Sequence, residues 1–280
     1  MPFLLYFGHV NIDIFLRVRD FGNAGESREV YSYFSRMGGT AYNAYRGLRA
    51  LNVPSEIFSV VGHNFEEDIE GHLVRDERTP TCWIITNGQE QMAYVYQGLW
   101  KELHKMDIDL PVEKYEYLHF STGNPKFYLK IAREARNLGK KIVFDPSQEI
   151  HYVYTKELFE KMIDLSDMFF CNVQEYRRAR EYAPSVLEEK IIVRTEGSSG
   201  ASFYTPQNGW IHVSTSPARV VDTTGAGDTF RAGFYAALYR GHDILDAVKY
   251  GNLAARRVVE SPKTYYEGTW ESLENMGNKI

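Results

Sequence analysis

The chain has 280 residues, 44% hydrophobic and 25% charged, which is the balance of an ordinary globular protein with a large core. A net charge of −5 excludes a general affinity for nucleic acid or anionic membranes, so local groups must hold any phosphate. No apolar run is long enough to span a bilayer, and no secretion signal is recognisable. Cys82 and Cys171 lack a metal-ligand spacing and are expected to be buried thiols, so we expect a cytoplasmic protein.

Apolar and β-branched runs dominate the first hundred residues. Residues 3–7 form a short continuous apolar run, typical of a buried parallel strand. The β-rich runs that follow do not alternate with helices, so we expect them to leave the main sheet. The elements predicted here are two strands within 14–36 joined by a polar loop, a helix at 41–51, a strand at 55–61, a polar helix at 64–75, and strands at 81–86 and 91–97 around an Asn-Gly turn.

Two polar side chains, Asn11 and Asp13, follow the first predicted strand. They are two residues apart, so in an extended segment they point the same way. Open α/β sheets bind ligands at the carboxyl ends of their strands, where this pair could bond the hydroxyls of an alcohol. A polar strand end that forms an Asx-turn explains the pair equally well.

A glycine pair, Gly38-Gly39, precedes the helix predicted at 41–51. Two glycines at a helix start let the backbone approach a ligand closely, and Asn43 would lie near that ligand. The alternative is a turn followed by an ordinary helix.

From about residue 115 the predicted strands alternate with helices. This alternation indicates a parallel sheet covered on both faces, which is an α/β fold. We find no internal repeat or linker, so a single domain is expected over residues 1–280. The strands are predicted at 115–121, 141–144, 168–171, 190–195 and 202–205, and the helices at 125–138, about 155–165 and about 243–259.

Asn172 and Glu175 lie three residues apart at a strand-to-helix junction. A carboxylate and an amide there suit a hydrated Mg²⁺, which usually keeps several waters and few protein ligands. An N-cap with a capping box explains the same spacing and is the better local interpretation.

The stretch from Asp222 to Phe234 holds the strongest signal in the chain. A Gly-Ala-Gly turn at 225–227 precedes a predicted helix. Phe230 and Phe234 are four residues apart and would lie on one buried face of that helix. Asp222-Thr223-Thr224 lies just upstream, where N-cap residues belong. Such a helix start directs free N–H groups and the positive end of the helix dipole at an anion. A carboxylate at Asp228 would repel phosphate, so its presence there is explained if it takes a proton from an attacking hydroxyl. The alternative is an acid in the first turn that only interacts favourably with the dipole of a capped helix.

Five segments in order resemble the signatures of the ribokinase-like (PfkB) carbohydrate and nucleoside kinases. They are Gly-x-x-Asn-x-Asp at 8–13, Gly38-Gly39 with Asn43, Asn-x-x-Glu at 172–175, Thr-x-Gly-x-x-Gly at 195–200, and Asp-Thr-Thr-Gly-Ala-Gly-Asp at 222–228. Together they span roughly residues 4–258. Several signatures in the expected order are far more specific than any one of them.

The resemblance implies a three-layer αβα fold with a mainly parallel sheet and a small β-lid formed by about 14–36 and 81–100. It also implies ATP as the donor and, often, a homodimer made through the lid. It assigns Asn11, Asp13, Gly38, Gly39 and Asn43 to the alcohol substrate. It places Asn172, Thr195, Gly197, Gly200 and Asn252 beside the nucleotide, Mg²⁺ near Glu175 through water, and a monovalent cation such as K⁺ near Asp222.

The predicted reaction is ATP-dependent phosphoryl transfer to a hydroxyl of a small sugar. Asp228 would act as the general base, and the backbone N–H groups of Gly225, Ala226 and Gly227 would stabilise the transferring phosphoryl group. The chain lacks the P-loop and protein-kinase motifs. Two alternatives stay open, a nucleoside kinase with a base pocket in the lid and a non-catalytic sugar- or nucleotide-binding regulator.

Overall fold

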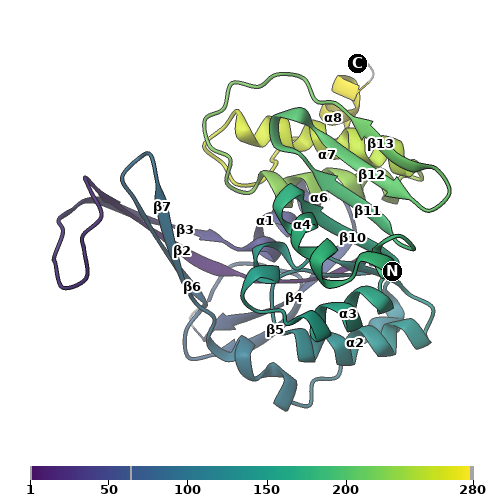
Figure 1. The fold of residues 1–280 in the computed structure, drawn as a ribbon, viewed down its shortest axis with the longest axis horizontal. Coiled ribbons are helices and arrows are strands. Elements are labelled where there is room, and N and C mark those ends of the chain that lie inside the picture. The colour runs from purple at the N-terminus through teal and green to yellow at the C-terminus, as the bar shows by residue number, and fades with distance from the viewer. Residues whose placement is uncertain (1, 64, 278–280) are drawn as a thin grey trace.

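A nine-stranded sheet runs through the centre of the molecule (Figure 1). The structure is a computed structural model that describes residues 2–63 and 65–277. The strand order is β13-β12-β11-β10-β9-β8-β1-β4-β5, parallel except for β12 and β13 at one edge. The strands are β1 (Leu4–Phe7), β4 (Ser55–Gly62), β5 (Gly71–Asp76), β8 (Tyr117–Phe120), β9 (Lys141–Phe144), β10 (Met168–Asn172), β11 (Ile191–Thr195), β12 (Ala201–Thr205) and β13 (Gly209–Val213).

Helices cover both faces of this sheet, because its strands are apolar on both sides. One apolar core lies under α1 (Thr40–Ala50), α6 (Ala226–Tyr239), α7 (Ile244–Val259) and α8 (Trp270–Gly277). The other lies under α2 (Pro125–Asn137), α3 (Lys156–Leu165), α4 (Val173–Tyr182) and α5 (Pro184–Leu187). Short 3-10 turns occur at Gly98–Lys105, Val112–Lys114, Ser147–His151 and Gly197–Ser199. The predicted three-layer α/β fold is confirmed.

A second sheet of four strands projects from the body and forms the lid (Figure 1). Its order is β3-β2-β6-β7, with β2 (Asn11–Val18), β3 (Val30–Gly38), β6 (Thr81–Thr86) and β7 (Gln91–Tyr96). The first of the two predicted lid segments ran from about residue 14 to residue 36. The strands start earlier and end later, so Asn11 and Gly38 belong to the lid and are directly paired.

The strand register gives the lid two distinct faces, since neighbouring residues of a strand point to opposite sides. Asp13 is paired with Arg36 and Cys82, so these share one face, which we call the inner face. Phe15 and Phe34 are paired on the same face and stack with ring centroids 4.6 Å apart. Tyr33, Trp83, Tyr94 and Tyr96 lie on the opposite, outer face.

The polar helix predicted at 64–75 is wrong. Residue 64 lies outside the described residues, 65–70 form a loop, and Gly71–Asp76 is the edge strand β5, parallel to β4. Leu73 packs into one core and Val74 into the other. Burial on both faces of the sheet outweighs the helical preference of the glutamates in this segment. Among the helices and strands, β13, α5 and α8 had no sequence prediction.

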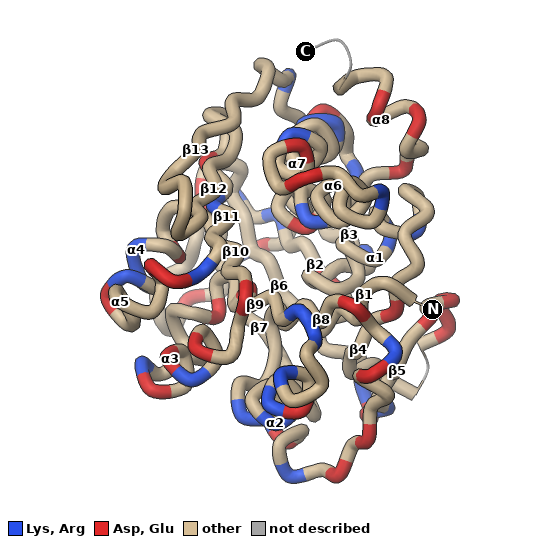
Figure 2. The backbone as a smooth tube through the Cα atoms, turned by 90° about the vertical axis from the view of Figure 1, so that its right-hand side faces the viewer, with Lys and Arg blue, Asp and Glu red and all other residues tan. Residues whose placement is uncertain are grey.

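Charged residues of both signs are interspersed along the chain (Figure 2). Among the described residues, no helix is both long and apolar enough to cross a membrane. Cys82 and Cys171 are buried free thiols, as predicted.

Candidate active site

Helix α6 begins without a side-chain cap. Its N-cap residue is Gly225, whose φ of 75° is left-handed, and a Cβ there would overlap the carbonyl group of Thr264. Only glycine fits such a position. The polar residues 222–224 were predicted to cap the helix, but they form the turn before it.

The turn leaves part of the predicted anion hole free. The Ala226 N–H donates to the carbonyl of Thr223 at 3.2 Å, so it already has an acceptor. Within the described part of the chain, no acceptor is found for the N–H groups of Gly225, Gly227 and Asp228. The first turn of α6 therefore offers free donors, but Ala226 is not one of them in this conformation.

Asp228 lies in that first turn and is joined to the other side of the cleft by Asn43. The Asn43 Nδ2 donates to Asp228 Oδ2 at 2.9 Å. Desolvation by the surrounding protein raises the pKa of Asp228 to about 6, although the positive charge of Arg231 opposes the rise. A carboxylate with a pKa of about 6 is ionised at neutral pH and suits a general base.

The residues predicted to bind the alcohol substrate lie beside Asp228. Asp13 is buried, and burial raises its pKa to about 6. Its negative charge also raises the pKa of Asp228. Gly38 lies against Asp13 so closely that a Cβ would overlap the carboxylate, and Gly39 is the N-cap of α1. The structure thus brings together both glycines, both asparagines and Asp13.

Two buried acceptor atoms in this cleft have no partner among residues 2–63 and 65–277. They are Asn11 Oδ1 and Asn43 Oδ1. A buried polar atom without a partner is costly, so both are suited to bonds with a polar ligand.

Asp222, predicted to lie beside a monovalent cation, has other partners. Its Oδ1 accepts from the Thr224 N–H at 2.8 Å, and its Oδ2 lies 3.4 Å from Arg36 Nη2 on the lid. Burial raises the pKa of Asp222, but these partners outweigh it and lower the pKa. Each carboxylate oxygen has one partner in this conformation, and a K⁺ beside Asp222 stays a prediction.

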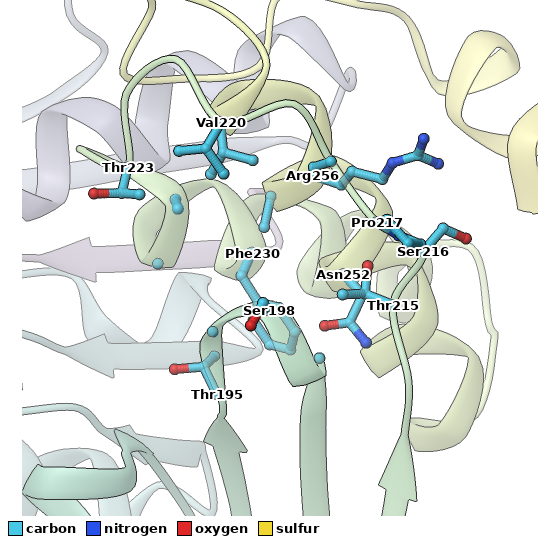
Figure 3. A pocket seen from close by; sticks show the side chains of 17 residues that line it. Thr195, Ser198, Thr215, Ser216, Pro217, Val220, Thr223, Phe230, Asn252 and Arg256 are labelled. Atoms are coloured by element: carbon cyan, nitrogen blue, oxygen red, sulfur yellow. The ribbon is translucent and has the colours of Figure 1, made fainter.

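The nucleotide-side residues line a cavity of about 270 Å³ between the loop after β11 and the start of α6 (Figure 3). Of the predicted residues, Thr195, Gly197, Gly200 and Asn252 lie on its wall, together with Ala226 and Gly227. The Asn252 side chain also donates to the Val213 carbonyl at 2.9 Å, which holds the end of β13. Sequence reasoning missed two further parts of the cavity wall. One is Arg256, and the other is the loop formed by Thr215, Ser216, Pro217, Ala218 and Val220.

Asn172 does not line this cavity. Its side chain accepts from the N–H groups of Gln174 and Glu175, and Glu175 Oε2 accepts from the Asn172 N–H at 2.7 Å. This is the capping box that the spacing also suggested. Asn172 positions Glu175 through its Oδ1, and its contact with the nucleotide stays a prediction.

Glu175 keeps one carboxylate oxygen free of hydrogen bonds in the described residues. The side chain is buried, and burial together with the negative charge of Asp145 raises its pKa to about 7. Such a carboxyl gains from a nearby cation. No group of three or more His, Cys, Asp or Glu within the described ranges could hold a metal ion directly. The unbonded oxygen of the buried Glu175 carboxyl suits contact with a hydrated Mg²⁺ through water.

A buried ion pair that sequence reasoning missed lies below the site. Arg231 of α6 binds the carboxylate of Asp145 at the end of β9, and His119 binds the same carboxylate. The one signal was a charged residue inside an otherwise apolar helix, between Phe230 and Ala232.

These features define a phosphotransferase site for a small alcohol, with a base and an anion-binding helix start facing a substrate cleft. The family model of the pfkB family carbohydrate kinases matches residues 1–271. The chain belongs to this family. Its membership leaves the non-catalytic alternative without support.

Several relatives extend over nearly the whole chain. It is 35% identical to a nucleoside kinase of Thermoplasma acidophilum, over 98% of this chain and 95% of that one. It is 30% identical to a nucleoside kinase of Methanothermobacter thermautotrophicus, over 99% and 94%. The solved nucleoside kinase of Methanocaldococcus jannaschii, an archaeal member of the ribokinase family, superposes with a TM-score of 0.89 at 29% identity, covering 100% of this chain and 99% of that one.

Asp228→Asn should lower kcat by about a hundredfold or more while ATP still binds, because the base is lost and the fold is kept. The base must be ionised, so wild-type kcat/KM should fall as the pH drops through about 6. Asp13 titrates in the same range, so the wild-type slope should exceed that of Asp228→Asn. Steady-state rates between about pH 5 and pH 9 test this. Full turnover in Asp228→Asn would remove Asp228 from the base role.

Proposed function

We propose that the protein is a nucleoside kinase that transfers the γ-phosphoryl group of ATP to a hydroxyl of the nucleoside's sugar. The observation that carries this proposal is the 35% identity over 98% of the chain to the nucleoside kinase of Thermoplasma acidophilum. The simple sugar expected first from the sequence thereby gives way to the nucleoside alternative.

The inner face of the lid supports a nucleoside. Asp13 can hold sugar hydroxyls, and its face also carries the aromatic pair Phe15 and Phe34. The two rings stack with an angle of 5° between their planes, with the Arg36 guanidinium 4.6 Å from the Phe15 centroid and the Arg17 guanidinium 5.8 Å from the Phe34 centroid. Together they form an aromatic surface flanked by two guanidinium groups. A polar hexose has little to gain from such a surface, whereas a nucleobase can stack on it.

The chemistry follows from the cleft. Asp228 accepts the proton of the hydroxyl as its oxygen attacks the γ-phosphorus, and Asn43 fixes the carboxylate through the Nδ2 bond. The free N–H groups at the start of α6 stabilise the charge on the transferring group. The lid excludes water, which would otherwise compete as the acceptor. Mg²⁺ bound through water at Glu175 would neutralise charge on the nucleotide oxygens.

A panel of nucleosides, pentoses, hexoses, sugar acids and ribose 1-phosphate, each with MgATP, tests the acceptor class. We expect at least one nucleoside to exceed ribose about a hundredfold in kcat/KM, because the base adds binding that free ribose lacks. Phe15→Ala should lower kcat/KM for that nucleoside about tenfold, since base–aromatic stacking is worth about 1–3 kcal/mol. The KM for ATP should not change.

Ile14→Ala is the matched control, because Ile14 precedes Phe15 and points to the outer face. It should leave kcat/KM for the nucleoside unchanged. Turnover on sugars alone, or equal losses in both variants, would contradict a base pocket on the inner face.

Glu175→Gln should raise the half-saturating Mg²⁺ concentration about tenfold and leave thermal stability nearly unchanged. Glutamine can still accept the Asn172 N–H and preserve the capping box, but it carries no charge. Glu181→Gln, at an exposed position of the same helix, is the control and should behave as wild type. An Mg²⁺ dependence unaltered in Glu175→Gln would exclude this role.

We also propose a homodimer through the outer face of the lid, as the family resemblance implies. Tyr33 and Tyr94 on this face are 76% and 58% exposed, which is unusual for a patch of aromatic residues. Tyr33→Glu should lower the mass in sedimentation equilibrium to that of one chain. Leu138→Glu changes an exposed apolar residue outside the lid and should leave the mass as in wild type. A wild-type monomer at micromolar concentration would overturn the proposal.

A further inference from the structure

Arg231 is a charged residue in the interior of α6, with only 8% of its side chain exposed. Its Nη2 donates to Asp145 Oδ1 at 2.7 Å, and its Nε donates to Asp145 Oδ2. His119 Nε2 lies 3.1 Å from the same Oδ2. The Tyr235 hydroxyl lies 2.8 Å from His119 Nδ1, and the Tyr6 ring stacks on the imidazole. The guanidinium is therefore held by both oxygens of one carboxylate, which His119 in turn binds.

The protonation states of this network are set by burial and by the ion pair. Burial lowers the pKa of His119, so the imidazole is neutral, with Nε2 donating to Asp145 and Nδ1 accepting from Tyr235. Burial raises the pKa of Asp145, but Arg231 and His119 outweigh it and hold the pKa at about 2. A buried pair of this kind is weak evidence for stability, because apolar residues of the same volume often stabilise as well. The position of the Arg231–Asp145 ion pair below the active site gives a more specific reason for its presence.

One edge of the guanidinium faces the anion hole. Helical side chains point back toward the helix N-terminus, so Arg231 reaches the first turn, where Gly227 and Asp228 lie. A Cβ on Gly227 would be 2.9 Å from Arg231 Nη1. In the described residues Nη1 has no hydrogen-bond partner, whereas Nε and Nη2 are both engaged with Asp145.

The cleft concentrates negative charge around this edge. Asp13 of the lid and Asp145, which directly follows β9, both act on Asp228, and the Tyr6 hydroxyl of β1 and the Asn43 amide of α1 also face it. Arg231 is the positive group buried among them, whereas Arg36 reaches in from the lid surface and pairs with Asp222.

We propose that Arg231 is a positioning residue, a fixed positive charge beneath the first turn of α6 that keeps Asp228 ionised as the proton acceptor. Asp145 and His119 hold the guanidinium in this place and stop it from pairing directly with Asp228. The inference rests on the proposed role of Asp228 as the general base. It explains how a carboxylate near two other acids, Asp13 and Asp145, stays available at neutral pH.

The two halves of the ion pair act on Asp228 with opposite signs. Arg231 lowers the pKa of Asp228, and Asp145 raises it. The base works only above its pKa, so loss of the Arg231 charge moves the acidic limb of kcat/KM to higher pH. Loss of the Asp145 charge moves that limb to lower pH. Loosened packing alone would lower the rate at every pH and move the limb in neither variant.

The experiment measures kcat/KM for the best nucleoside from about pH 5 to pH 9 in wild type, Arg231→Gln, Arg231→Lys and Asp145→Asn. In Arg231→Gln the limb should rise by about one pH unit, so the loss near pH 6.5 should exceed the loss near pH 9 about tenfold. Arg231→Lys keeps the charge and should return the limb close to its wild-type position. Asp145→Asn should shift the limb downward.

The outcomes separate this inference from the assignment of the base. An unmoved limb in both Arg231→Gln and Asp145→Asn, with Asp228→Asn inactive, overturns the role of Arg231 and leaves Asp228 as the base. Full activity of Asp228→Asn overturns the base assignment and this inference with it. If circular dichroism shows Arg231→Gln unfolded, Asp145→Asn decides: a downward shift supports the proposal, and an unmoved or raised limb contradicts it.

Discussion

Gly225 adopts a left-handed backbone conformation, and this single constraint lets α6 begin with free N–H groups instead of a side-chain cap. The first turn then places Asp228 at the edge of the cleft, where Asn43 of α1 binds it. α1 and α6 are in close contact, since a Cβ on Gly47 would lie 2.8 Å from the Cβ of Ala232. The acceptor side and the phosphate side of the site are therefore held by two directly packed helices, and their geometry does not depend on a flexible loop.

The cleft combines a rigid floor with a lid whose inner face carries Asp13 and Arg36 beside aromatic residues. Burial raises the pKa of Asp13 to about 6. Desolvation, with the added charges of Asp145 and Asp13, raises the pKa of Asp228 to about 6. A single buried guanidinium, Arg231, offsets this charge from below. In the proposed complex, Asp13 of the lid would bind the sugar and the stacked Phe15–Phe34 pair would contact the base.

Sequence reasoning predicted what is encoded locally and missed what depends on distant partners. The turn at 225–227 and the Gly38-Gly39 pair could be placed because glycine is needed at each of them, and the alternating strands and helices gave the α/β fold. Arg231 could not be placed, because its partner Asp145 is 86 residues away. The ion pair between Arg36 and Asp222 spans 186 residues. The helix predicted at 64–75 failed because pairing with β4 overrides local propensity.

The central claim is that a nucleoside binds between Asp228 and the inner face of the lid. A crystal structure with a nucleoside and a non-hydrolysable ATP analogue tests it most directly. The account predicts one sugar hydroxyl within about 2.6–3.2 Å of an Asp228 carboxylate oxygen. It also predicts a second hydroxyl on Asp13 and the base against Phe15 and Phe34. A nucleoside found in the cavity lined by Thr195 and Asn252, with the acceptor cleft empty, would contradict the account.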